Sequence, residues 1–68
     1  LIEDEPNIVE AMRFILQRQD LSVATHSEGG ATAMAAVLRH TPDLVILDIM
    51  LPNRSGFEVL KELLKEIV

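Results

Sequence analysis

Two patterns of apolar and polar positions divide the chain. Residues 44–47 are an uninterrupted run of branched apolar side chains that ends on Asp48. A run this short and continuous is typical of a parallel strand buried on both faces. An imperfect alternation over residues 21–26 predicts a second, more exposed strand, and Leu1 with Ile2 predicts the last residues of another. The sequence therefore predicts three short strands.

Apolar side chains recur at helical spacing in the three segments that remain. Residues 6–19 are expected to form a helix with a proline in its first turn, where the missing N–H is no loss. The alanine-rich residues 31–39 predict a second helix that ends before Pro42. Ser55, with Glu58 three residues later, has the form of a capping box that opens a third helix. The apolar stripes are Ile8, Met12, Ile15 and Leu16 in the first helix and Phe57, Leu60, Leu64 and Ile67 in the third, widened there by Val59, Leu63 and Val68.

The order of the expected elements is strand, helix, strand, helix, strand, helix. Such alternation predicts an α/β fold with a parallel sheet and right-handed crossovers. The 68 residues are enough for one small domain at most.

Composition excludes several kinds of function. The chain has no cysteine, so a disulfide framework and a thiolate metal site are ruled out. A net charge of −5 and only two aromatic residues argue against direct nucleic-acid binding by this segment. No apolar run reaches the length of a membrane span, and we expect a cytoplasmic location. The chain begins without methionine, and we expect it to be a piece of a longer protein.

Acidic residues follow two of the expected strands. Glu3 and Asp4 come after the first strand and Asp48 after the third. Because parallel strands end at a common edge, these side chains are expected to converge there. Converging carboxylates suit Mg²⁺, and Asp48 could then act as the nucleophile in a phosphoryl transfer. The spacing favours equally the alternative that Glu3 and Asp4 form only a solvated turn beside a helix N-terminus.

Other residues that could bear chemistry are expected to have ordinary structural roles. Asp43 fits a turn after Pro42, and His26 and His40 lack any partner pattern, which favours surface or loop-end positions. The three methionines are expected to fill the core: Met12, Met34 and Met50.

Three separated motifs together resemble the receiver domain of two-component response regulators. They are EDEPN at residues 3–7, PDLVILD at residues 42–48, and MLP followed by SGFE within residues 50–58. The resemblance covers essentially the whole chain, so that residues 1–68 correspond to part of a receiver domain. It implies a three-layer α/β fold of flavodoxin-like topology, reduced here to about three strands and three helices with strand order 2-1-3.

The resemblance also implies a role for each acidic residue. Asp48 matches the phosphoacceptor, which receives a phosphoryl group from a sensor histidine kinase or a phosphotransfer protein. Glu3 and Asp4 match the acidic pair that holds Mg²⁺, Asp4 directly and Glu3 through water. Met50 matches the position whose backbone carbonyl completes the metal site. The chain would then be a signalling phosphoacceptor and not an enzyme.

The sequence departs from the family pattern after the third helix. The hydroxyl residue and the lysine that end the family's fourth and fifth strands have no counterpart in this chain. Two alternatives therefore stand beside phosphotransfer. One is a binding-only receiver-like fragment, and the other is an aspartyl-phosphate phosphatase, which usually needs a second acid where Met50 stands. Because the third strand would be an uncovered apolar edge, self-association is also expected.

Overall fold

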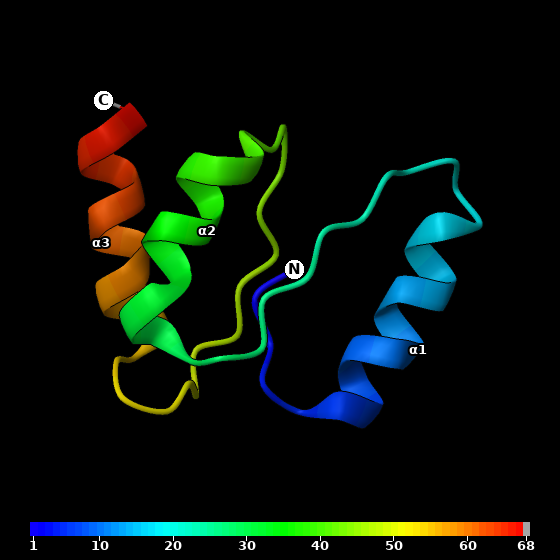
Figure 1. Cartoon of the computed structure of the whole chain (residues 1–68), viewed down its shortest axis with the longest axis horizontal. Coiled ribbons are helices and arrows are strands. Elements are labelled where there is room, and N and C mark those ends of the chain that lie inside the picture. Colours follow the sequence, from blue (N-terminus) through cyan, green and yellow to red (C-terminus); the bar gives the residue numbers. More distant parts are fainter. Residues whose placement is uncertain (68) are drawn as a thin grey trace.

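The structure is a computed structural model that describes residues 1–67, the side chain of Ile67 excepted. The expectations for that side chain and for Val68 lie outside the described residues. Each of the three predicted helices is present, and a single 3-10 turn precedes the second (Figure 1). The elements are α1 (Pro6–Gln17), η1 (Gly30–Thr32), α2 (Ala33–His40) and α3 (Gly56–Ile67).

Local chemistry explains where the helices begin and end. Pro6 occupies the first position of α1, where no N–H is needed. The helix ends two residues earlier than predicted, and Asp20 has a φ of 60° shortly afterwards. The second helix starts two residues later than predicted because residues 30–32 form the tighter 3-10 turn. It ends at His40, since Thr41 adopts a left-handed conformation before Pro42.

The three predicted strands are replaced by three extended segments that pair at single points. In chain order these segments contain residues 1–2, 21–26 and 44–47. Ile2 forms one parallel bridge with His26 and another with Leu47. The central segment has room for only one bridge on each side, because α1 begins four residues after Ile2. No strand of two or more successive bridges therefore forms among the described residues. The position of Ile2 between the two other segments agrees with strand order 2-1-3, which stays a prediction.

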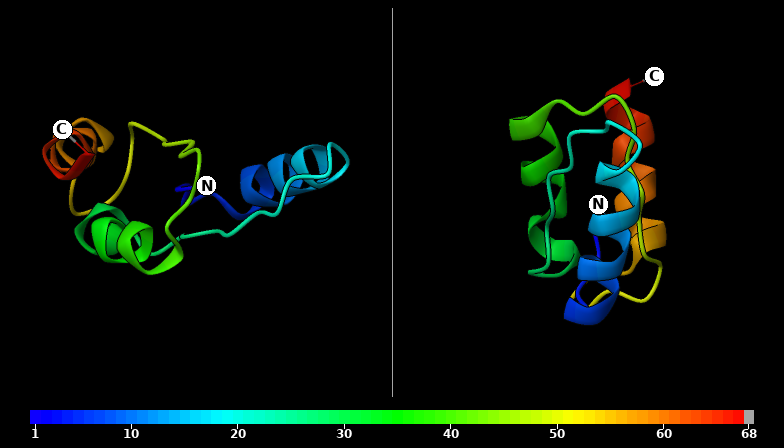
Figure 2. Two further views of the ribbon diagram at one scale, coloured as in Figure 1. Left: turned by 90° about the horizontal axis from the view of Figure 1, so that it is seen from above. Right: turned by 90° about the vertical axis from the view of Figure 1, so that its right-hand side faces the viewer.

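Helices lie on both sides of these extended segments. Helices α2 and α3 lie side by side on one face, and α1 lies on the other, as two perpendicular views agree (Figures 1 and 2). The core lies between the segments and the α2–α3 pair. Its buried side chains are Ile2, Ala33, Val59 and Leu63, with Met34, Val37, Val45, Leu47 and Leu51 packed against them.

The predicted apolar stripe of α3 is only partly correct, because the residues that widen it are buried and its main positions are exposed. Phe57, Leu60 and Leu64 are 58%, 43% and 52% exposed, whereas Val59 and Leu63 are buried. The helix carries apolar residues on two overlapping stripes, so periodicity could not decide which stripe faces inward. Contact with α2 and Ile2 selects the stripe of Val59 and Leu63.

The predicted stripe of α1 is only partly correct. Val9 is the buried residue of this helix, Met12 and Leu16 are half-buried, and Ile8 and Ile15 are exposed. The reason is the lack of a neighbour, since no other helix among the described residues packs against α1. The extended segments cover only a narrow strip of its surface.

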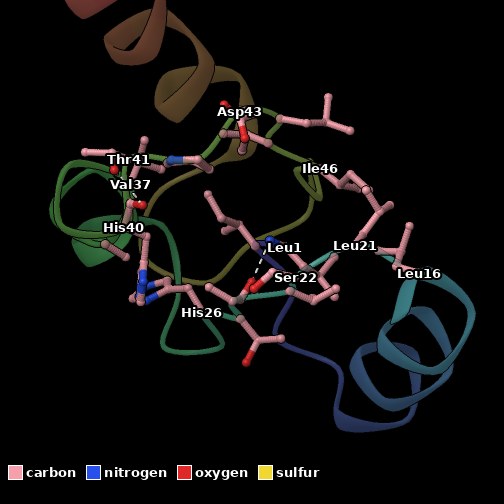
Figure 3. A pocket seen from close by; sticks show the side chains of 18 residues that line it. Leu1, Leu16, Leu21, Ser22, His26, Val37, His40, Thr41, Asp43 and Ile46 are labelled. Carbon is pink, nitrogen blue, oxygen red and sulfur yellow. Dashed lines mark hydrogen bonds between the residues drawn. The ribbon is translucent and has the colours of Figure 1, made fainter. Parts of the chain in front are cut away.

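An open apolar groove of about 360 Å³ lies between the starts of the second and third extended segments (Figure 3). Leu21, Val23 and Val45 line it, and the amino group of Leu1 donates a hydrogen bond to the Ala24 carbonyl beside it. The acidic residues at the other ends of the segments do not line this groove. Within residues 1–67, no helix has the length and apolar character needed to cross a membrane.

The assignment of the buried face of α3 predicts unequal effects of two alanine substitutions. Val59→Ala removes a side chain that is 1% exposed and should lower the free energy of unfolding by roughly 2 kcal/mol. Leu64→Ala, on the exposed stripe, should change it by less than about 0.5 kcal/mol. Urea unfolding followed by circular dichroism measures both, and equal losses would contradict the assignment.

Self-association stays a prediction, and the exposed apolar residues of the extended segments are the reason for it. Leu44, in the third extended segment, is 70% exposed. We expect the chain to form oligomers as its concentration rises and Leu44→Lys to reduce them, because a charged edge blocks strand pairing. Leu21→Lys, in the second segment, is the matched control. Size-exclusion chromatography with light scattering tests this, and a monomer at every concentration would refute it.

Candidate functional site

Three carboxylates meet at one end of the extended segments. Carboxylate oxygens of Glu3, Asp4 and Asp48 all lie within 4.8 Å of one another. Backbone pairing brings them together, since the Asp48 amide donates to the Ile2 carbonyl at 2.9 Å. Parallel pairing at Ile2 thus places the residue after Leu47 beside the residues after Ile2. The predicted convergence of these three acids is confirmed.

Backbone amides orient two of the three carboxylates. The Glu5 amide donates to Glu3 Oε2 at 3.2 Å, and the Met50 amide donates to Asp48 Oδ1 at the same distance. Each bond joins a side chain to the amide two residues later, which ties the carboxylate to its own turn. Glu3 is buried at 7% exposure, whereas Asp4 and Asp48 are half-buried.

The electrostatics of the cluster are unfavourable without a cation. Burial raises the pKa of the Glu3 carboxyl, and the nearby Asp48 and Asp4 raise it further against the lowering effect of the Glu5 amide. Among the described residues, no arginine or lysine forms an ion pair with the cluster, since the ion pairs join Arg13 to Glu10 and Arg54 to two glutamates of α3.

The donor set fits a hard divalent cation. Carboxylate oxygens are the ligands that Mg²⁺ prefers, and it commonly takes one or two carboxylates while keeping several waters. A divalent charge at this point would offset the repulsion that raises the pKa of Glu3. The cluster is therefore a candidate Mg²⁺ site at the edge where the extended segments end.

Met50 does not fill the core as predicted. Its side chain is 82% exposed, whereas Met12 and Met34 are half-buried and Met34 packs against the core. The residue turns outward because its amide is bonded back to Asp48 and the chain leaves the extended segment there. Its backbone therefore lies beside Asp48 while its side chain faces solvent.

The loop of residues 49–55, which follows Asp48, is closed by contacts that sequence reasoning missed. The Gly56 amide donates to the Ile49 carbonyl at 2.8 Å, and a Cβ on Gly56 would clash with the Asp48 backbone. The Gly30 amide donates to the Pro52 carbonyl at 3.0 Å. The glycine that begins α3 was a detectable signal for a close approach, but its partner could not be read from spacing.

The predicted capping box is half formed. The Glu58 amide donates to Ser55 Oγ at 3.4 Å. The Glu58 carboxylate instead accepts a hydrogen bond from Arg54 Nε at 3.3 Å. The sequence pattern located the start of α3 correctly, but did not reveal the arginine that competes for the glutamate.

Two of the residues expected to be ordinary, Asp43 and His40, lie apart from the acidic cluster, whereas the His26 carbonyl accepts the Glu3 amide at 3.0 Å. Asp43 and His40 are exposed and line the groove at the opposite ends of the segments. His26 is half-buried, with Nε2 3.2 Å from the Gly29 carbonyl oxygen and 2.9 Å from Thr32 Oγ1. His26 thus has partners that the sequence did not indicate, and they fix the loop that leads into η1.

The fold and the site together define helices on both sides of three extended segments, with an acidic cluster at one end of these segments. The family model described as the response regulator receiver domain matches residues 1–67. The chain therefore belongs to the response regulator receiver domain family, which serves two-component signal transduction. Membership implies the flavodoxin-like α/β fold.

Curated relatives agree with this assignment. The transcriptional regulatory protein KdpE of Mycobacterium tuberculosis is 47% identical over 60 residues, covering 88% of this chain and 26% of that protein. The alkaline phosphatase synthesis transcriptional regulatory protein PhoP of Bacillus subtilis is 38% identical over 63 residues, covering 93% and 26%.

A protein-glutamate methylesterase/protein-glutamine glutaminase of Syntrophus aciditrophicus is 34% identical over 68 residues, covering 98% of this chain and 19% of that protein. The chain thus spans about a quarter or less of the length of these relatives. No solved structure matches it.

The raised pKa of Glu3 predicts how stability depends on pH. A carboxyl whose pKa is raised by folding stabilises the fold below its ordinary pKa, and this contribution is lost as pH rises through the raised value. Without Mg²⁺, the free energy of unfolding should therefore fall as the pH rises from the ordinary pKa of a glutamate to the raised pKa of Glu3. Glu3→Gln should remove this part of the fall, and saturating Mg²⁺ should reduce it in the parent chain.

Urea unfolding from about pH 4 to about pH 8 measures this effect. Glu28→Gln is the matched control, because Glu28 is exposed and lies outside the acidic cluster. If the free energy of unfolding of Glu3→Gln depended on pH as that of the parent does, the raised pKa of Glu3 would not be the cause of the fall.

Proposed function

We propose that this chain is the phosphoacceptor part of a response regulator and that Asp48 receives the phosphoryl group. One observation supports this above the others: in a chain of the receiver family, Asp48 lies with Glu3 and Asp4 in one acidic cluster. The donor is a phosphohistidine of a sensor histidine kinase or of a phosphotransfer protein, as is general for the family.

The proposed reaction exchanges one bond to phosphorus for another. An oxygen of the Asp48 carboxylate attacks the phosphorus of phosphohistidine, a P–O bond forms, and the P–N bond breaks with its electron pair returning to the imidazole nitrogen. The product is an acyl phosphate on Asp48. The Met50 amide, bonded to Oδ1, orients the carboxylate for this attack.

Charge repulsion is the main barrier that the site has to overcome, since the phosphoryl group is itself anionic. When bound, Mg²⁺ would offset this charge. In this proposal Asp4 and Asp48 would bind the cation, Glu3 would hold it through water, and the Met50 carbonyl would complete the site. The buried Glu3 would then be ionised only at the cost of its desolvation, which the cation offsets.

The proposal extends to partners and location in general terms. Residues 1–68 act as one partial receiver unit, which contacts its phosphodonor and does not itself bind nucleic acid, consistent with the net charge of −5. A cytoplasmic location fits a partner of sensor kinases. Regulation of transcription, which the names of the relatives indicate for those proteins, would belong to the whole protein.

Phosphorylation of Asp48 is tested by exposing the chain to a small acyl phosphate or phosphoramidate with Mg²⁺. We expect Asp48→Asn to reduce incorporation to background, because the nucleophile is lost. Asp43→Asn should leave it unchanged, since Asp43 lies at the other end of the same segment. Intact-mass spectrometry and radiolabel counting measure the product.

Two outcomes would contradict the proposal. Equal labelling of Asp48→Asn and the parent would place the phosphoryl group elsewhere. Mg²⁺ binding by the parent without any labelling would instead support the alternative of a binding-only fragment.

A further inference from the structure

Arg54, in the 49–55 loop, is held on α3 by two carboxylates. Its Nε donates to Glu58 Oε2 at 3.3 Å, and its guanidinium also pairs with the Glu62 carboxylate. The two glutamates lie one turn apart on α3, so the arginine side chain is fixed along the helix rather than at a single point. It is about one-third exposed, which limits its motion further.

The backbone of Arg54 is fixed at the same time. Its amide donates to the Pro52 carbonyl at 2.8 Å, and that carbonyl also accepts the Gly30 amide at 3.0 Å. A Cβ on Gly30 would clash with the Arg54 carbonyl, so the two backbones are in direct contact. The far side of the loop is thus held between η1 and α3.

Helix stability does not account for this arginine. A cation just before a helix N-terminus opposes the helix dipole, and Glu58 in the first turn of α3 would favour the helix without any arginine. The two ion pairs instead anchor the 49–55 loop to α3. The near side of this loop is the part that directly follows Asp48, and the hydrogen bond from the Gly56 amide to the Ile49 carbonyl closes the loop there.

We propose that Arg54 is a positioning residue for the cation site, an inference that rests on the proposed function of Asp48 and Met50. Anchoring the far side of a short closed loop restricts its near side, where the Met50 amide holds Asp48 Oδ1. Loss of the anchor lets the Met50 carbonyl and the Asp48 carboxylate sample more positions. The cation then binds to a less preorganised set of oxygens.

The first test is Mg²⁺ affinity, measured by titration calorimetry on the whole chain. Arg54→Ala should weaken binding about two- to fivefold, the scale of a partly exposed ion-pair network. Glu62→Gln should weaken it in the same direction, and Arg54→Lys should keep most of the affinity.

The sign of the change is diagnostic. Removing a positive charge near an acidic cluster should by itself strengthen cation binding. Lys61→Ala, which removes an exposed cation of α3 outside the loop, is the matched control for that general effect. Arg54→Ala binding Mg²⁺ as tightly as Lys61→Ala, or more tightly, would overturn the proposal.

A second readout needs no metal and separates this proposal from the proposed function. Amide hydrogen exchange at Gly30 and Gly56 reports the two bonds that close the loop. Both amides should exchange about two- to fivefold faster in Arg54→Ala than in Lys61→Ala, at an unchanged urea midpoint. Equal exchange would overturn the positioning role even if Mg²⁺ binds. Faster exchange in a chain that binds no Mg²⁺ would support the anchoring of the loop by Arg54 and would overturn the proposed cation site.

Discussion

Backbone pairing of residues 1–3 with both neighbouring segments is the interaction on which the rest of the structure depends. Ile2 donates to the Ile46 carbonyl at 2.8 Å and accepts from the Asp48 amide at 2.9 Å. On the other side of Ile2, the Glu3 amide donates to the His26 carbonyl, and the His26 amide donates to the Leu1 carbonyl. This register fixes which residues leave the segments together. It also buries the Ile2 side chain against α2 and α3, so that core and acidic cluster have one origin.

The register that forms the acidic cluster has an energetic cost, and it also brings together oxygens that could bind a cation. Burying Glu3 beside two other carboxylates disfavours its charged form, and this raises the pKa of the Glu3 carboxyl. In the proposed function, a divalent cation bound by the three acids would offset this repulsion. We regard this repulsion as the physical link between the paired segments and the proposed phosphoacceptor chemistry.

The sequence predicted the site better than it predicted the packing. The convergence of Glu3, Asp4 and Asp48 followed from the rule that parallel segments end at a common edge, and a single pair of bridges was enough to produce it. The inward face of α3 could not be predicted in this way. Its apolar positions form two overlapping stripes, and only contact with Ile2 and α2 distinguishes them. The outward Met50 and the anchoring of Arg54 depend on loop geometry, which periodicity does not report.

The proposed function requires that the carboxylates of Glu3, Asp4 and Asp48 form one cation site. An NMR titration of the chain with Mg²⁺, in which backbone amide shifts are followed, tests this requirement. We expect the largest shifts on residues 3–5 and 48–50, and we expect Asp48→Asn to reduce them strongly. The same response in Asp48→Asn and in the parent chain would contradict it.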